Sequence, residues 1–245
     1  MLAPVVSSVV NAEGGSTTIA PNTWVAISGS ALAPVGDLRI WQGSDFLNDQ
    51  MPAQLDGVNV TINGENAFVY YISPNQVNVL TPPDLASGLV QVTVTTGRMT
   101  SAAFTAQAQQ YSPSFFIFGA GPYLVATHVD GSLLGPASLY PGLTTPAVPG
   151  EVVILYANGF GPVSPPVTSG SDVQSGSLPV LPVIQIGGIS ASVQFAGLVS
   201  PGLFQFNVVV PATATDGDNM LTAQYNGLKT PTGVLLTVKS NNPPN

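Results

Sequence analysis

Gln205-Phe206-Asn207-Val208-Val209-Val210-Pro211 is the stretch on which the interpretation of this 245-residue chain rests. β-Branched and aromatic residues fill it and a proline ends it, which is typical of a β-strand. A near copy, Gln76-Val77-Asn78-Val79-Leu80-Thr81-Pro82, stands 129 positions earlier. Each copy follows a Ser-Pro pair and precedes a glycine that opens the next apolar run (Ser73-Pro74 and Gly88; Ser200-Pro201 and Gly217). The chain therefore holds two versions of one β unit and is predicted to be a tandem repeat.

The length suits one large or two ordinary domains, and the repeat favours two. We expect a first domain over residues 1–110, a second over 111–240, and a flexible, proline-rich tail over 241–245. Each half is long enough to bury roughly two-thirds of the surface that its unfolded chain exposes. The chain has no cysteine, which excludes disulfides, zinc–thiolate sites and thiol catalysis and fits an exported bacterial protein.

Charged residues are scarce: 4 Lys+Arg and 12 Asp+Glu make up 7% of the chain, against roughly 25% in ordinary soluble domains. The formal net charge of −8 argues against nucleic acid and against anionic membrane surfaces, since both attract clusters of basic residues. No run of 18 apolar residues is present, so no membrane insertion is expected. A surface with few lysines does little to keep the sheet edges of neighbouring molecules apart, so self-association is expected to be easy.

Short apolar runs at about ten-residue spacing, separated by turn residues, predict strands throughout and no long helix. Asn63-Gly64 follows the alternating run 58–62 and predicts a tight hairpin, and Gly187-Gly188 stands at the same place in the second copy. The fold class is therefore all-β, with two tandem Ig-like β-sandwich domains. The expected strands are 4–10, 24–29, 38–41, 58–62, 67–72, 76–82, 89–94, 102–106, 115–118, a hairpin over 123–134, 152–159, 184–188, 192–195, 205–211, 220–225 and 234–238.

Several short motifs make a resemblance specific: Val9-Val10-Asn11-Ala12, Ile19-Ala20-Pro21, Ile27-Ser28-Gly29-Ser30-Ala31-Leu32, Ser73-Pro74-Asn75-Gln76-Val77-Asn78, Pro149-Gly150-Glu151, Tyr156-Ala157-Asn158-Gly159-Phe160-Gly161-Pro162 and Ala196-Gly197-Leu198. With them the chain resembles, over about residues 5–239, the Solibacter-type uncharacterised C-terminal domains of exported acidobacterial proteins, which are tandem Ig-like modules related to the IPT/TIG group. The resemblance implies a secreted sandwich fold with no established activity and brings no catalytic residues.

No constellation of reactive side chains stands out. His128 is the only histidine; Asp130 lies two residues on in a hairpin, and no Gly-x-Ser-x-Gly elbow accompanies it, so a surface histidine is favoured over a hydrolase base. The three glutamates (Glu13, Glu65, Glu151) each stand near a turn rather than in a facing pair. We therefore predict no enzyme activity, no catalytic residue and no cofactor.

Carboxylates in loops raise the question of calcium, a hard cation that takes six or more oxygen ligands. Asp216-Gly217-Asp218-Asn219 could offer some of them, as could Asp45 and Asp49, but Asp-Gly is ordinary turn chemistry and the spacing of an EF-hand is absent. We predict no metal site.

Aromatic side chains supply the one candidate contact surface. Trp24, Trp41, Tyr70, Tyr71 and Tyr111 could form a platform for sugar stacking, although aromatic residues in sandwiches lie mainly in the core. Tyr70 and Tyr71 are adjacent in an expected strand, so one of them must point outward. We predict the contact surface at Tyr70, Tyr71 and Trp41.

These features favour a non-enzymatic extracellular structural protein, with itself as the main partner: a self-assembling subunit of a cell-surface filament. Rigid tandem sandwiches repeat well end to end, and the strands at 4–10 and 234–238 are expected to offer open edges to the next subunit. The alternatives are an adhesin or carbohydrate-binding module that uses the loops 36–50 and 163–181, with glycans as partners, and a spacer domain of a larger secreted protein. Met1-Leu2-Ala3-Pro4 lacks the features of a signal peptide, so we expect either a removed leader or a piece of a longer chain.

Overall fold

The structure is a computed structural model that describes residues 2–119 and 121–240. The flexible tail expected at 241–245 lies outside the described residues. Within them the secondary structure is almost entirely β, and the one helical segment is the 3-10 turn η1 (Gly43–Asp45). In the described part of the chain, no helix has the length and apolar character needed to cross a membrane. The all-β fold class predicted from the sequence is thus confirmed.

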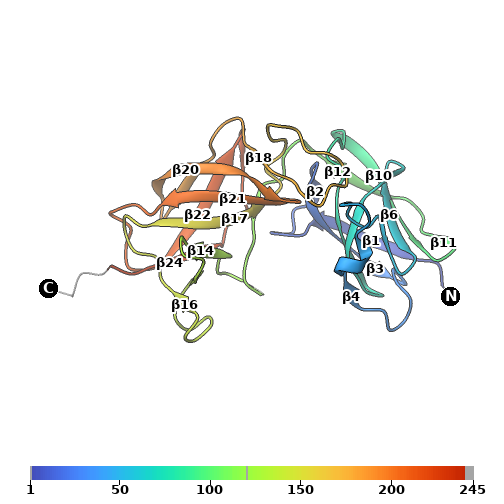
Figure 1. Cartoon of the computed structure of the whole chain (residues 1–245), viewed down its shortest axis with the longest axis horizontal. Helices are drawn as coiled ribbons and strands as arrows, with labels where there is room; N and C mark the ends of the chain where they lie inside the picture. Colours follow the sequence, from blue (N-terminus) through green and yellow to red (C-terminus); the bar gives the residue numbers. More distant parts are fainter. Residues whose placement is uncertain (1, 120, 241–245) are drawn as a thin grey trace.

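The strands fall into two sequential sets, which we call the first unit (β1 to β12) and the second unit (β13 to β24); they lie side by side along the long axis of the molecule (Figure 1). The strands of the first unit are β1 (Val5–Asn11), β2 (Thr18–Ile19), β3 (Trp24–Ser30), β4 (Arg39–Ile40), β5 (Gln54–Leu55), β6 (Val58–Ile62), β7 (Glu65–Asn66), β8 (Phe68–Ile72), β9 (Gln76–Leu80), β10 (Gly88–Thr96), β11 (Met99–Thr100) and β12 (Phe104–Ala108). Those of the second unit are β13 (Ser114–Phe115), β14 (Ala126–His128), β15 (Leu133–Leu134), β16 (Thr144–Thr145), β17 (Val152–Asn158), β18 (Gly176–Ser177), β19 (Val183–Ile186), β20 (Ile189–Ser200), β21 (Leu203–Val209), β22 (Gly217–Tyr225), β23 (Leu228–Lys229) and β24 (Leu235–Val238).

The repeat seen in the sequence recurs in the pairing of the strands. The two quoted stretches form β9 and β21. In the first unit β9 pairs antiparallel with β3 on one side and β8 on the other, and in the second unit β21 pairs antiparallel with β17 and β20. On the facing layer, β10 pairs with β6, β11 and β12, and β22 pairs with β19, β23 and β24 in the same way. Both glycine turns form as predicted: Asn63 and Gly64, like Gly187 and Gly188, have positive φ, as a two-residue hairpin turn requires.

The two units differ in how the chain crosses between their layers. In the first unit the crossing falls at Ala67, which separates β7 in one sheet from β8 in the other. In the second unit the corresponding strand is unbroken: β20 pairs with β19 through Ile189–Ala191 and with β21 from Ser192 onward. A register shift between Val193 and Phe195 accompanies this change of partner. The layers of the second unit are therefore joined through one continuous 12-residue strand.

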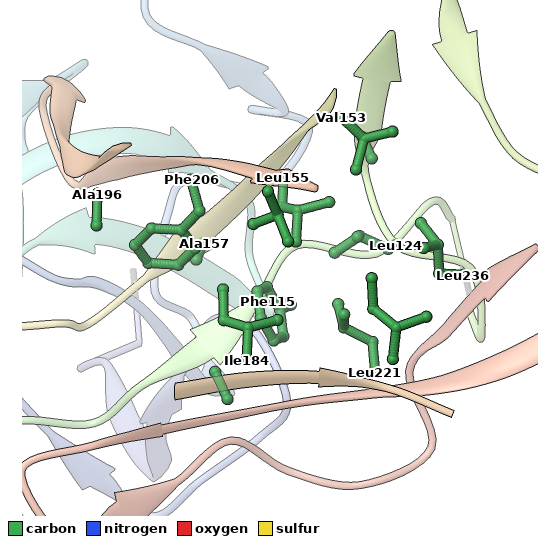
Figure 2. Close-up of a cluster of buried hydrophobic side chains, with 14 of the residues drawn as sticks. Phe115, Leu124, Val153, Leu155, Ala157, Ile184, Ala196, Phe206, Leu221 and Leu236 are labelled. Carbon is green, nitrogen blue, oxygen red and sulfur yellow. The ribbon is translucent and has the colours of Figure 1, made fainter. Parts of the chain in front are cut away.

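Each unit has its own buried core. One cluster of buried hydrophobic side chains runs from Val9 to Ala108 and the other from Phe115 to Val238, and the two share no member. In the second core, Figure 2 shows Phe115, Leu155 and Phe206 between the layers, above Ile184 and Leu221. Alternation places these side chains inward, because successive residues of a strand point to opposite faces. The division into 1–110 and 111–240 stays our prediction for the domain limits.

Candidate functional site

Four aromatic rings of the first unit pack together, and Trp24 and Tyr70 among them lie next to the second unit. Trp24 begins β3, Tyr70 lies in β8, and Trp41 and Phe46 flank η1. The ring centroids of Trp24 lie 5.6 Å from Trp41 and 5.4 Å from Tyr70, and those of Trp41 lie 5.1 Å from Tyr70 and 4.9 Å from Phe46. All four pairs are edge-to-face, an arrangement favoured by the ring quadrupoles. We call these four residues the aromatic cluster.

A β-bulge explains why Tyr70 is available to the cluster. The register of β8 against β9 shifts between Val69 and Tyr71, so that Tyr70 is the extra residue. Val69 and Ile72 belong to the buried core, and both tyrosines between them are only partly buried. Strict alternation would have sent one tyrosine inward, but the bulge leaves both outside the core. Of the predicted contact residues, Trp41 and Tyr70 meet in the cluster and Tyr71 forms none of its ring pairs.

The cluster sits beside a hydrogen-bonded joint between the units. Asn158, at the end of β17, is fully buried; its side-chain oxygen accepts from the Trp24 N–H at 3.0 Å, and its amide nitrogen donates to the Trp24 carbonyl at 3.0 Å. The same nitrogen donates to the side-chain oxygen of Asn11 at 2.9 Å. Asn11 in turn donates to the carbonyl of Ser112. A side chain of the second unit thus pairs with the first unit as a strand backbone would.

The second Ser-Pro motif, Ser200-Pro201, contacts Trp24 as well. Pro201 and Gly202 form the turn between β20 and β21, and the Trp24 indole N–H donates to the Pro201 carbonyl at 3.0 Å. Gly202 has φ +65°, and a Cβ there would collide with the indole and with Leu80. Glycine is required at this position both by the turn and by the close approach of the two units.

A third contact joins the two loops that the carbohydrate-binding alternative uses. The loop before β18 extends over the first unit (Figure 1). In it, Gly170 accepts a backbone hydrogen bond from Met51, and Asp172 donates one to Asp49. A bridge between Gln50 and Ser171 lies between them. Parts of the loops 36–50 and 163–181 therefore bind each other.

Between the units lies a cleft of about 330 Å³, lined by Ala12, Glu13, Trp24, Tyr70, Asn78, Phe116, Ser200, Pro201 and Leu203. We call it the inter-unit cleft. Trp24 and Tyr70 come from the first unit, and Phe116 follows β13 of the second. Burial raises the pKa of the Glu13 carboxyl to about 7, opposed in part by the backbone of Ile117. The cleft thus combines three aromatic rings with one carboxyl group whose charged form is poorly solvated.

His128 has a carboxylate partner, but not the one nearest in sequence. Its Nδ1 lies 2.5 Å from Oε1 of Glu151, and its Nε2 lies 2.9 Å from Oγ1 of Thr145. Asp130 instead accepts from the hydroxyl of Ser132. The other oxygen of Glu151 accepts from the backbone of Val148, so the carboxylate braces the turn that leads into β17. The sequence position of Glu151 near a turn suggested an isolated carboxylate, but its side chain instead connects β14 to the start of β17.

The acidic loop residues are held by protein partners. Arg39 donates to Asp45 at 2.7 Å and to Asp56 at 2.6 Å, which lowers the pKa of both carboxyls. Asp216 accepts from the hydroxyl of Ser240, and Asp218 from that of Thr237. Within residues 2–119 and 121–240, no group of three or more histidine or acidic side chains is placed to hold a metal ion.

Comparison with known proteins supports Ig-like, TIG-related modules. Residues 4–112 match the IPT/TIG domain family. No curated protein matches the sequence. The narrower likeness to exported acidobacterial proteins stays a prediction.

Among solved structures, the chain is similar to the full extracellular region of plexin A4, at 12% identity and a TM-score of 0.28, covering 96% of this chain and 18% of that one. It is also similar to SGBP-B of the Bacteroides ovatus mixed-linkage glucan utilization locus in complex with a mixed-linkage heptasaccharide, at 10% identity and a TM-score of 0.34, covering 91% and 44%. A tandem of titin Ig domains matches at 11% identity and a TM-score of 0.25, covering 98% and 97%. The chain spans less than half the length of the first two.

Three residues of the site were not singled out from the sequence. Asn158 was noted only as part of a motif, Glu13 only as one of three glutamates, and Phe116 only as a strand residue. Each acts through a contact with the other unit, and strand periodicity carries no information about such contacts. The repeat offered one signal for a contact between the units. Trp24 and Val152 occupy the same position in the two copies, so the first copy has an aromatic residue where the second has an aliphatic one.

Proposed function

We propose that the chain is a non-enzymatic extracellular structural protein, the subunit of a cell-surface filament that assembles end to end. The observation that carries this proposal is the buried joint around Asn158, which fixes one unit against the other through both the backbone and the indole of Trp24. A rod with a fixed joint repeats the same geometry in every copy, and a head-to-tail contact that does not close gives a filament.

The free edges of the terminal strands limit which strand can pair with the next subunit. β24, predicted to offer an open edge, pairs with β22 on one side, and on the other its Leu235 and Thr237 carbonyls accept backbone hydrogen bonds from Leu124 and Ala147. β1 pairs only with β3 among the described strands and lies at the border of its sheet. A shift between Val6 and Ser8 bulges β1, a feature that limits pairing with another chain to the regular segments on either side of the bulge. We therefore assign the assembly edge to β1 alone.

Negative-stain microscopy of the purified chain tests the proposal. We expect filaments with one axial repeat per chain, in which the two units of each copy keep the arrangement of Figure 1. A monodisperse monomer at high concentration would overturn it.

The aromatic cluster favours a second candidate, an adhesin or carbohydrate-binding module. Rings of Trp24 and Tyr70 reach the inter-unit cleft, and sugar rings stack on such side chains. A glycan array distinguishes the two candidates, because a pure filament subunit gives no saturable binding to any glycan.

A further inference from the structure

The inter-unit cleft has an unusual combination of linings. Trp24, Tyr70 and Phe116 supply aromatic surface, and Glu13 supplies the only carboxyl group among the lining residues. Asn78 and Ser200 add neutral polar groups. At about 330 Å³, the cleft is near the lower end of the range for small-molecule sites, roughly 300–1,000 Å³.

Glu13 has no cation to pair with. The ion pairs of the described residues join Arg39 to Asp45 and Asp56, and His128 to Glu151, so that none includes Glu13. No lysine, arginine or histidine lines the cleft, and Tyr70 is the only other titratable group that does. Burial without a compensating charge is the reason why the pKa of Glu13 rises to about 7.

The chemistry that this arrangement would recognise is a positive charge on an organic group. The faces of aromatic rings are electrostatically negative and attract ammonium groups, most strongly where water is partly excluded. A carboxylate nearby adds a full negative charge, and a bound cation would restore the stabilisation that burial removes from it. An anion would be repelled, and a metal ion would find a single carboxyl group among the lining residues. A neutral sugar could stack on the rings but would supply no positive charge to the Glu13 carboxylate.

We propose that the inter-unit cleft is a binding site for a small organic cation, such as a methylated ammonium compound, held between the rings of Trp24, Tyr70 and Phe116 and the carboxylate of Glu13. The site needs both units, because Phe116 and Leu203 come from the second and the other two rings from the first. It is independent of assembly, since β1 offers its open edge outside the residues that line the cleft.

Intrinsic fluorescence provides the assay, because both tryptophans of the chain belong to the aromatic cluster. Choline and tetramethylammonium are the probes, and glucose and cellobiose are the neutral comparison. We expect saturable quenching by the ammonium compounds and none by the sugars. If only ionised Glu13 binds, the apparent affinity falls about 30-fold between about pH 8 and about pH 5.5.

Glu13→Gln keeps the shape of the side chain and removes its charge, so it should weaken choline binding at least about tenfold and remove most of the pH dependence. Phe116→Leu should weaken binding through the loss of one ring. Glu65→Gln is the matched control, because Glu65 is exposed in β7 and lies outside the cleft. This variant should bind choline with the same affinity as the wild type. Thermal unfolding of each variant verifies that it is folded.

The proposal fails if choline does not quench saturably, or if folded Glu13→Gln binds choline as well as the wild type does. Saturable binding of the sugars with no response to ammonium also overturns it, and would favour the carbohydrate-binding candidate instead. None of these outcomes bears on filament formation, which microscopy measures separately.

Discussion

At the scale of single residues, the site depends on polar groups that the units place between them. Asn11 and Asn158 are completely buried, and each satisfies its amide through contacts across the joint. Glu13 lies two residues after Asn11 and donates its backbone N–H to the Asn11 side chain. A turn that serves the joint therefore also carries the carboxyl group into the cleft.

The raised pKa of Glu13 predicts a pH dependence of stability. The carboxyl titrates near 4.5 in the unfolded chain and near 7 in the folded one, so unfolding releases a proton within this window. The free energy of unfolding of the wild type, relative to that of Glu13→Gln, should therefore be highest below pH 4.5 and fall as the pH rises through about 7. After allowance for solvent screening of a partly exposed group, we expect a change on the order of 1–2 kcal/mol.

Urea denaturation of both proteins at about pH 5 and about pH 8 measures this difference. Glu65→Gln should show no such change, because Glu65 is exposed. A constant difference between wild type and Glu13→Gln at both pH values would mean that the carboxyl is well solvated in the folded protein.

At the scale of elements, the sequence predicted most strands and both glycine turns, because alternation and turn residues are local signals. It failed where an element departs from regular pairing. The bulge at Tyr70 turns two successive side chains away from the core, and β20 continues through a crossing that the first unit makes with a break at Ala67. Neither feature follows from residue types, since both depend on the partner strand. The open edge of β1 and the covered edge of β24 are likewise properties of the sheets, not of the strands alone.

The assignment of β1 as the assembly edge predicts that a charge placed on it blocks assembly. Val5 is 56% exposed at the start of β1, so Val5→Lys should leave the fold intact and abolish filaments at concentrations where the wild type assembles. Val129→Lys is the matched control, because Val129 is 66% exposed and lies in the turn after β14 of the second unit. Microscopy of both variants decides the assignment: filaments of Val5→Lys equal to those of the control would exclude pairing through β1.

At the scale of the whole molecule, the two units have separate cores but share polar contacts at three places: the asparagine joint, the turn at Pro201, and the loops that meet at Gln50 and Ser171. Separate cores allow independent unfolding, whereas shared buried contacts couple the units. The balance between the two determines whether the chain behaves as a rod or as two linked sandwiches, and a filament of fixed geometry needs the rod.

Because the joint couples the two units, we expect the wild type to unfold in one cooperative transition and a substitution at the joint to separate it into two. Asn158→Ala removes both hydrogen bonds to the Trp24 backbone and the one to Asn11. The Trp24 backbone N–H loses its partner, at a cost of about 1–3 kcal/mol, whereas the Trp24 carbonyl and the Asn11 side-chain oxygen still accept from the N–H groups of Ala12 and Glu13. We expect calorimetry to show one unfolding transition for the wild type and two for Asn158→Ala, and small-angle X-ray scattering of the variant to show a wider spread of inter-unit distances. Asn66→Ala, at an exposed asparagine of β7, should behave as the wild type. If Asn158→Ala keeps one transition and an unchanged scattering profile, the joint does not hold the units together, and the argument for a rigid filament subunit loses its basis.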